Sequence, residues 1–232
     1  MVQAILAHQK IETRRVVAAS NTVGFTPLKR SLDFSTIYDN GKLGVKVCDE
    51  DGRLWRGACK WQPGDLIWVK ETFARPFVCG PDDKEAFLYK SEESHNQGKT
   101  AIMGYKWKPS LFMPKHAARI WLRVTSAVPW PLHFIKAADA INEGIKIFRP
   151  VPGDGPAKTH YYDYINNEWI LNPIQSFLTL WESINGFASW LENPMVWVIK
   201  FEVLSTTGKP HVWKGKQLRV DEEASMKHAT AK

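Results

Sequence analysis

The segment His8-Gln9-Lys10-Ile11-Glu12-Thr13-Arg14-Arg15 joins two different local patterns. Before it, Val2, Ile5 and Leu6 fall at helical spacing, and after it Val16-Val17 reads as the start of a strand. A junction between a helix and a strand can direct backbone and side chains into a cleft. We therefore expect this segment to organise the rest of the chain.

Lys10 and Thr13 carry the most distinctive chemistry of this segment. On one helical turn their spacing would put them on the same face, whereas in an extended strand they would point to opposite faces. A neutral lysine beside a threonine is a base beside a hydroxyl nucleophile. Arg14 and Arg15 can hold a phosphate or a carboxylate through paired N–H groups. The plainer interpretation is that the basic cluster is a solvated helix end.

Composition indicates a globular protein with an anionic partner. The chain has 232 residues, 44% of them hydrophobic, and a formal net charge of +7. A basic balance favours a polyanionic partner. The 11 Trp residues, interleaved with basic residues, suit stacking on nucleobases, although we expect most of them to fill the core.

Metals, cofactors and membranes are not indicated by the sequence. Cys48, Cys59 and Cys79 match no zinc spacing, and the seven His residues are scattered. We expect free thiols, no metal and no cofactor. No apolar run approaches membrane-spanning length, and residues 1–7 are too short for a signal peptide. The sequence therefore predicts a cytoplasmic protein.

Patterning predicts a mixed α+β fold, namely a small mixed sheet or barrel with two helices. The helices are expected at 131–144 and 173–185, where Asn172 is a helix N-cap. Apolar residues on both faces of the last strand indicate a central position in the sheet. The predicted strands are 43–47, 53–56, 66–69, 86–89, 117–128 and 195–204. The first two of these should form a hairpin around Asp51-Gly52.

One domain is expected over residues 1–204, with a polar tail at 205–232. Turn residues and polar composition indicate three insertions in that domain. They lie near 18–60, 75–105 and 146–172.

Five motifs occur in an order similar to that of the ASCH-domain proteins of the PUA-like superfamily, in their long phage-encoded branch. The resemblance spans residues 4 to 201. The matching stretches are Ala4–Arg15, Pro63–Phe73, Trp107–Ile120, Asp139–Ile145 and Leu180–Gly186 with Trp190–Phe201. Within the first motif, His8, Gln9 and Ile11 replace the family's glycine, arginine and threonine.

This resemblance implies a small β-barrel with flanking helices and a cleft that binds RNA or a modified nucleoside. Some members are amidohydrolases that remove the acyl group from N4-acetylcytidine. By motif, Lys10 would be the base, Thr13 the nucleophile and Glu143 the proton donor. Substrate contacts would come from Arg14, Arg15, Glu71, Lys70 and Trp68.

The proposed chemistry requires a neutral lysine. Burial and the like charges of Arg14 and Arg15 would both lower the pKa of Lys10. Lys10 would then take the proton of Thr13, and Glu143 would protonate the leaving amine of cytosine. Glu71 is expected to pair with Arg14 and fix its orientation.

Two classes of function remain open at this level. The chain is either such an amidohydrolase or a phage RNA- or DNA-binding module without chemistry, with a regulatory or counter-defence role. A ribonuclease is a third option.

Overall fold

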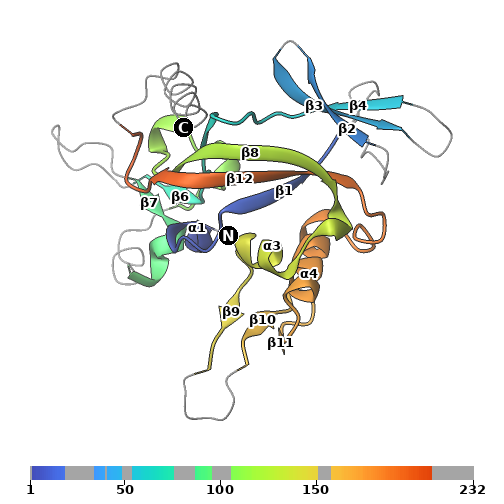
Figure 1. The fold of residues 1–232 in the computed structure, drawn as a ribbon. Helices are drawn as coiled ribbons and strands as arrows, with labels where there is room; N and C mark the ends of the chain where they lie inside the picture. Colours follow the sequence, from blue (N-terminus) through green and yellow to red (C-terminus); the bar gives the residue numbers. More distant parts are fainter. Residues whose placement is uncertain are drawn as a thin grey trace, which may run out of the picture. The chain divides into compact units, whose positions relative to one another are not determined.

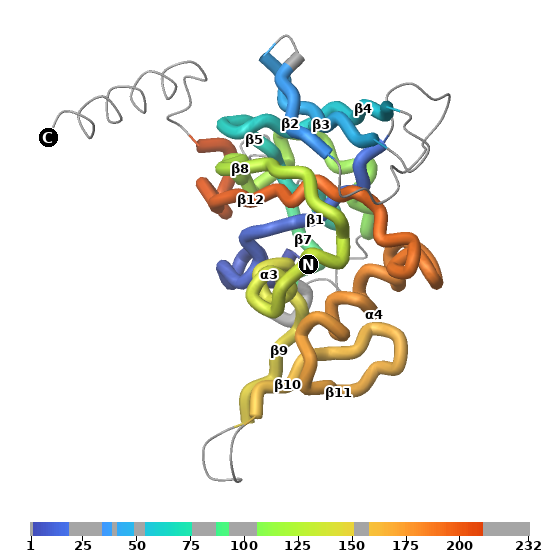
Figure 2. The backbone as a smooth tube through the Cα atoms, turned by 45° about the vertical axis from the view of Figure 1, so that its right-hand side comes forward, coloured from blue at the N-terminus to red at the C-terminus, as the bar shows by residue number. Residues whose placement is uncertain are grey.

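The computed structural model describes residues 2–18, 34–39, 41–48, 54–75, 87–95, 106–150 and 158–210. The chain divides into two compact units, Met1–Asp65 with Val124–Val203 and Leu66–Arg123 with Leu204–Lys232. The architecture is mixed α+β, with many strands and few helices (Figures 1 and 2). Neither Cys48 nor Cys59 forms a disulfide, and Cys79 lies outside the described residues.

The first unit holds most of the regular structure. Its elements are α1 (Val2–Leu6), β1 (Glu12–Val16), β2 (Phe34–Asp39), β3 (Lys42–Cys48), β4 (Leu54–Ala58), η4 (Leu132–Phe134), α3 (Ala137–Asn142), β9 (Ile147–Phe148), β10 (His160–Tyr162), β11 (Trp169–Ile170) and α4 (Pro173–Asn185). The second unit contains β5 (Leu66–Trp68), β6 (Phe73–Ala74), β7 (Leu88–Tyr89), η1 (Lys90–His95), η2 (Ser110–Phe112) and η3 (Lys115–Ala117). Strand β8 (Trp121–Pro131) continues from the second unit into the first, and β12 (Met195–Ser205) lies almost wholly in the first.

The largest sheet has the strand order β1-β12-β8-β5 and curls like half of a barrel (Figure 1). Strand β12 is central, as predicted, and residues Met195–Ile199 are buried on both faces. Strand β1 pairs with it in antiparallel register, with Thr13 opposite Ile199. The predicted helix-to-strand junction is confirmed, because α1 ends at Leu6 and β1 begins at Glu12.

The predicted hairpin is confirmed, but it has a third strand. Strand β3 pairs with β4 and also with β2, which lies in the insertion expected near 18–60. The turn signal near Gly41 connects these two strands. Asp39 pairs with Lys42, and Gly41 has a φ of 74°. Asp51-Gly52 lies outside the described residues.

The first predicted helix is shorter than expected. The α-helical part is Ala137–Asn142, and a separate 3-10 turn occupies Leu132–Phe134. Pro131 and Ile135 are extended, with ψ values of 141° and 133°, so the backbone between them does not continue as one helix. The predicted C-terminal stop is confirmed, since Gly144 follows the helix with a φ of 78°.

The segment 146–172, expected to be an insertion, contains a three-stranded sheet of order β11-β10-β9. These strands have two or three residues each, which is too short for a clear period in the sequence. Helix α4 begins as predicted, because the side chain of Asn172 accepts hydrogen bonds from the backbone N–H groups of Ile174 and Gln175. Together α3, α4 and β12 enclose a core around Leu132, whose remaining members are Ile135, Ala140, Ile145, Phe177, Trp181, Val196 and Val198.

Strand β5 lies within the predicted strand 66–69, and its three residues are half-buried. The core of the second unit instead forms around Phe73, Met113 and Trp121, and Trp68 packs at its margin.

Candidate functional site

The side chains of β1 alternate between the two faces of the strand. The Arg14 guanidinium donates to Glu12 Oε1 at 2.6 Å, and the Arg15 guanidinium donates to Thr13 Oγ1 at 2.8 Å. Residues two apart on a strand share a face, which accounts for both contacts. The extended alternative for Thr13 is therefore the observed one, and the helical turn joining it to Lys10 is not present.

Lys10 is buried and bonded through all three of its ammonium donors. Its Nζ atom donates to the backbone oxygen of Glu12 at 2.8 Å, to the backbone oxygen of Glu143 at 2.7 Å and to Glu143 Oε2 at 2.8 Å. Burial lowers the pKa of Lys10, while the Glu143 carboxylate opposes that effect. The predicted shift of this pKa thus has the predicted direction, and burial is its largest cause.

Glu143 contacts both Lys10 and Arg14 of the predicted site. It follows α3, and its Oε1 atom accepts from Arg14 at 3.2 Å while its Oε2 atom accepts from Lys10. The next residue, Gly144, packs so closely that a Cβ there would lie 2.7 Å from Lys10 Cβ. Asp139 adds a third carboxylate, 3.6 Å from Arg14 Nη2. Lys10, Arg14 and Glu143 therefore converge, although they are far apart in sequence.

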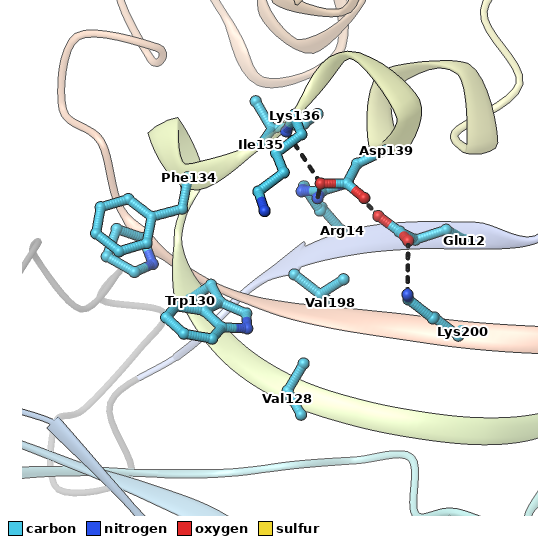
Figure 3. A pocket seen from close by; sticks show the side chains of 11 residues that line it. Glu12, Arg14, Val128, Trp130, Phe134, Ile135, Lys136, Asp139, Val198 and Lys200 are labelled. Carbon is cyan, nitrogen blue, oxygen red and sulfur yellow. Dashed lines mark hydrogen bonds and ion pairs between the residues drawn. The ribbon is translucent and has the colours of Figure 1, made fainter.

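A pocket of about 450 Å³ opens beside this cluster (Figure 3). Its charged lining comprises Glu12, Arg14, Asp139 and two lysines, Lys136 and Lys200. Its apolar side carries two aromatic rings, Trp130 and Phe134, whose centroids are 5.7 Å apart. These rings are 43% and 47% exposed, so part of each is open to a ligand.

Glu12 is the residue whose role the sequence left unassigned. Its Oε2 atom is buried and accepts no hydrogen bond from any residue that the structure describes. The Nζ atom of Lys200 lies 3.8 Å from it, which is an ion pair beyond hydrogen-bonding distance. Burial raises the pKa of Glu12, and Arg14 opposes the rise. The available signal was its spacing from Arg14, because residues 12 and 14 of one strand share a face.

Thr13 belongs to the opposite face of β1. Its hydroxyl is bonded to Arg15, and Arg15 lines a second pocket of about 180 Å³ together with Arg14 and Glu143. Helix α4 supplies most of the apolar lining of that pocket, including Phe177, over which the Arg14 guanidinium lies at 5.7 Å. Thr13 is thus joined to the cluster through Arg15, whereas the hydrogen bonds of Lys10 go to Glu12 and Glu143.

Glu71 has different partners from those predicted. Its Oε1 atom accepts from Arg119 Nε at 3.0 Å, and its Oε2 atom accepts from Arg119 Nη2 at 2.9 Å and from Ser91 Oγ at 2.8 Å. The expectation that Glu71 orients Arg14 was therefore wrong. Arg119 satisfies Glu71 within the second unit, and Arg14 is oriented by Glu12, Asp139 and Glu143.

Lys70 and Trp68 also have their contacts in the second unit. The Lys70 ammonium donates to the backbone oxygen of Leu111 at 3.1 Å and lies 5.3 Å from the centre of the Trp68 ring. The structure therefore brings together Lys10, Arg14, Arg15 and Glu143 with Thr13 alongside, and it places Glu71, Lys70 and Trp68 in another set of contacts.

Comparisons with family models, curated proteins and solved structures find no match to this chain. Among the described residues, no group of three or more His, Cys, Asp or Glu side chains is arranged to hold a metal ion. No helix in the described part of the chain is long and apolar enough to cross a membrane.

Proposed function

We propose that the chain binds a nucleobase or nucleoside in the pocket beside Glu12. The observation that carries this proposal is the unbonded Oε2 atom of Glu12, buried at the wall of that pocket. A buried carboxylate oxygen without a donor is costly to maintain, and a ligand N–H group would satisfy it. The exocyclic amine of cytosine is such a donor, and carboxylates accept from it in nucleic-acid recognition.

The other walls of the pocket support the same class of ligand. Trp130 and Phe134 offer partly exposed rings on which a base can stack. Lys136 and Lys200 supply positive charge for a ribose-linked phosphate. The volume of about 450 Å³ falls in the range of small-molecule sites. The resemblance to ASCH-domain proteins also implies a nucleoside or RNA ligand.

Titration calorimetry with cytidine, uridine and adenosine tests the proposal. Cytidine should bind best, and Glu12→Gln should weaken it roughly tenfold, because a charge-assisted hydrogen bond is lost. Glu192→Gln, an exposed carboxylate, is the matched control and should bind like the wild type. The proposal fails if the folded protein binds none of the three nucleosides, or if Glu12→Gln binds cytidine as tightly as the wild type.

Hydrolysis of an N4-acylated cytidine is the second candidate, and the buried Lys10–Glu143 pair favours it. Neutral Lys10 would take the Thr13 proton while Thr13 Oγ1 bonds to the acyl carbon. The C–N bond then breaks as Glu143, which must have taken a proton from the Lys10 ammonium beforehand, protonates the leaving amine, and water hydrolyses the resulting ester. This route requires Lys10 to exchange one of its present hydrogen bonds for Thr13.

Release of cytidine from N4-acetylcytidine separates this candidate from binding alone. Lys10→Arg keeps the charge but cannot act as a base near neutral pH, so turnover should be lost. Thr13→Ser should retain part of the activity, and Thr13→Val none. If the wild type releases no cytidine, the binding module without chemistry is the correct function.

A further inference from the structure

The small sheet β9–β11 presents two faces of opposite character. One face carries Ile147, Tyr161 and Ile170, which pair across the strands. Ile147 and Tyr161 pack against the core cluster around Leu132. By the alternation of strands, Phe148, His160, Tyr162 and Trp169 lie on the other face. The register confirms this grouping, because Phe148 is opposite His160 and Tyr162 is opposite Trp169.

The rings on the outer face form a continuous layer. Phe148 lies 5.6 Å from Trp169 and 6.3 Å from His160, and Trp169 lies 5.3 Å from Tyr162. The ammonium of Lys146 sits 4.4 Å from the centre of the Tyr162 ring. Phe148 and Trp169 are 50% and 46% exposed, although burial would stabilise rings of this size. We refer to Lys146, Phe148, His160, Tyr162 and Trp169 as the aromatic platform.

The charges around the aromatic platform indicate the sign of its partner. In the described residues 146–149 and 158–170, the exposed charged side chains are Lys146, Arg149, Lys158 and Glu168. Asp163 is buried, and its carboxylate accepts hydrogen bonds from the backbone N–H groups of Ile165 and Asn166. Three exposed cations against one exposed anion complement a phosphate backbone.

We infer that the aromatic platform binds single-stranded RNA or DNA by stacking bases on Phe148 and Trp169, with phosphates held by the flanking cations. Stacking on exposed rings beside positive charge is the general mode of binding to single strands, and it tolerates any base. The inference deepens the proposed function, on which it rests for the class of ligand, by making the ligand a polymer. The pocket beside Glu12 would bind one nucleoside, and the platform would hold other nucleotides of the strand.

Fluorescence anisotropy with a labelled oligouridine of about 12 nucleotides tests the platform. Trp169→Leu, which keeps apolar bulk but removes the ring, should weaken binding roughly 5- to 150-fold. Trp169→Phe keeps a ring and should retain most of the affinity. Phe187→Ala, at a side chain that is 92% exposed and outside this sheet, is the matched control and should have no effect. Affinity should also fall steeply as salt rises.

Two outcomes overturn the inference. In the first, Trp169→Leu binds oligouridine as tightly as Phe187→Ala does. In the second, the wild type binds no oligouridine, and the platform would then bind a protein partner. Cytidine binding measured on the same variants keeps the two proposals apart. Trp169→Leu should bind cytidine normally, whereas Glu12→Gln should bind it weakly. Loss of oligouridine binding with normal cytidine binding therefore supports the platform specifically.

Discussion

Two buried carboxylates, Glu71 and Glu12, show how similar residues serve different ends. Both are almost fully buried, with exposures of 2% and 0%, and each is paired with an arginine. Both oxygens of Glu71 accept hydrogen bonds, from Arg119 and Ser91. Glu12 has one oxygen bonded to Arg14 and one that accepts no hydrogen bond among the described residues.

The two residues differ in whether both carboxylate oxygens accept a hydrogen bond. A fully bonded buried carboxylate holds segments together, because every acceptor is satisfied inside the protein. An unsatisfied one beside a pocket leaves its acceptor for a ligand. Only the second arrangement provides a reason to expect binding, which is why the proposed function rests on Glu12 and not on Glu71. The following predictions test that distinction, beginning with the largest effect.

Arg119→Met should destabilise the protein by about 3–5 kcal/mol, because it leaves the buried Glu71 carboxylate without its cation. Urea unfolding measures this change. The paired replacement Glu71→Leu with Arg119→Met should recover much of the loss, since an apolar pair no longer buries a charge. Cytidine binding by the folded protein should be unchanged. A stable Arg119→Met variant would show that Glu71 does not have the structural role assigned to it.

Gly144→Ala should lower the free energy of unfolding by about 2–4 kcal/mol, because it combines a left-handed backbone with a steric clash. The φ of Gly144 is 78°, and its new Cβ would lie 2.7 Å from Lys10 Cβ and 2.9 Å from Ala4 Cβ. The substitution should therefore also displace Lys10 from Glu143.

Gly64→Ala is the matched control for this substitution. Gly64 has a φ of 90°, but its Cβ would meet no described atom within 4 Å. Gly64→Ala should lower the free energy of unfolding only by the cost of placing an L-residue in a left-handed conformation, about 1–2 kcal/mol. Equal losses in the two variants would contradict the close packing of Gly144 on Lys10.

The sequence predicted the parts of the site that depend on local spacing. The turn from α1 into β1 and the end of the helix at Gly144 both followed from local residue patterns. The contact between Lys10 and Glu143 is tertiary, and its prediction came from the family resemblance. The partner of Glu71 was not readable, because it depends on which arginine the tertiary fold brings near. The aromatic sheet of 147–170 was missed because its strands are too short to show alternation.

Glu12→Gln should change how stability depends on pH. The raised pKa of Glu12 means that the native state holds this proton to a higher pH than the unfolded chain, where a glutamate ionises near pH ~4.3. Between those two values the native state binds more protons, so this group lowers the free energy of unfolding as pH rises.

Glutamine does not titrate, so Glu12→Gln should lack this component. The difference in free energy of unfolding between variant and wild type should move in favour of the variant as pH rises through that window, by up to ~1.4 kcal/mol per pH unit. Urea unfolding of both proteins from acid to neutral pH gives the difference directly. A difference that is flat with pH would mean that Glu12 ionises as an ordinary exposed carboxylate does, and the contrast with Glu71 would lose its basis.

Lys200→Met should have the smallest effect on stability, within about 0.5 kcal/mol of the wild type. The Lys200 ammonium is half-exposed and lies 3.8 Å from Glu12 Oε2, so water screens the pair and no hydrogen bond is lost. At this distance Lys200 makes no hydrogen bond to Glu12 Oε2, so cytidine should bind Lys200→Met as it binds the wild type.

A ligand that carries a phosphate should respond differently to Lys200→Met. Cytidine 5′-monophosphate should bind the variant roughly fivefold more weakly, because one cation of the pocket is missing. Calorimetry with both ligands on Lys200→Met and on Lys136→Met identifies which lysine the phosphate approaches. Equal weakening of cytidine and its monophosphate in Lys200→Met would show that Lys200 acts on Glu12 itself, and Glu12 Oε2 would then be as fully engaged within the protein as both oxygens of Glu71.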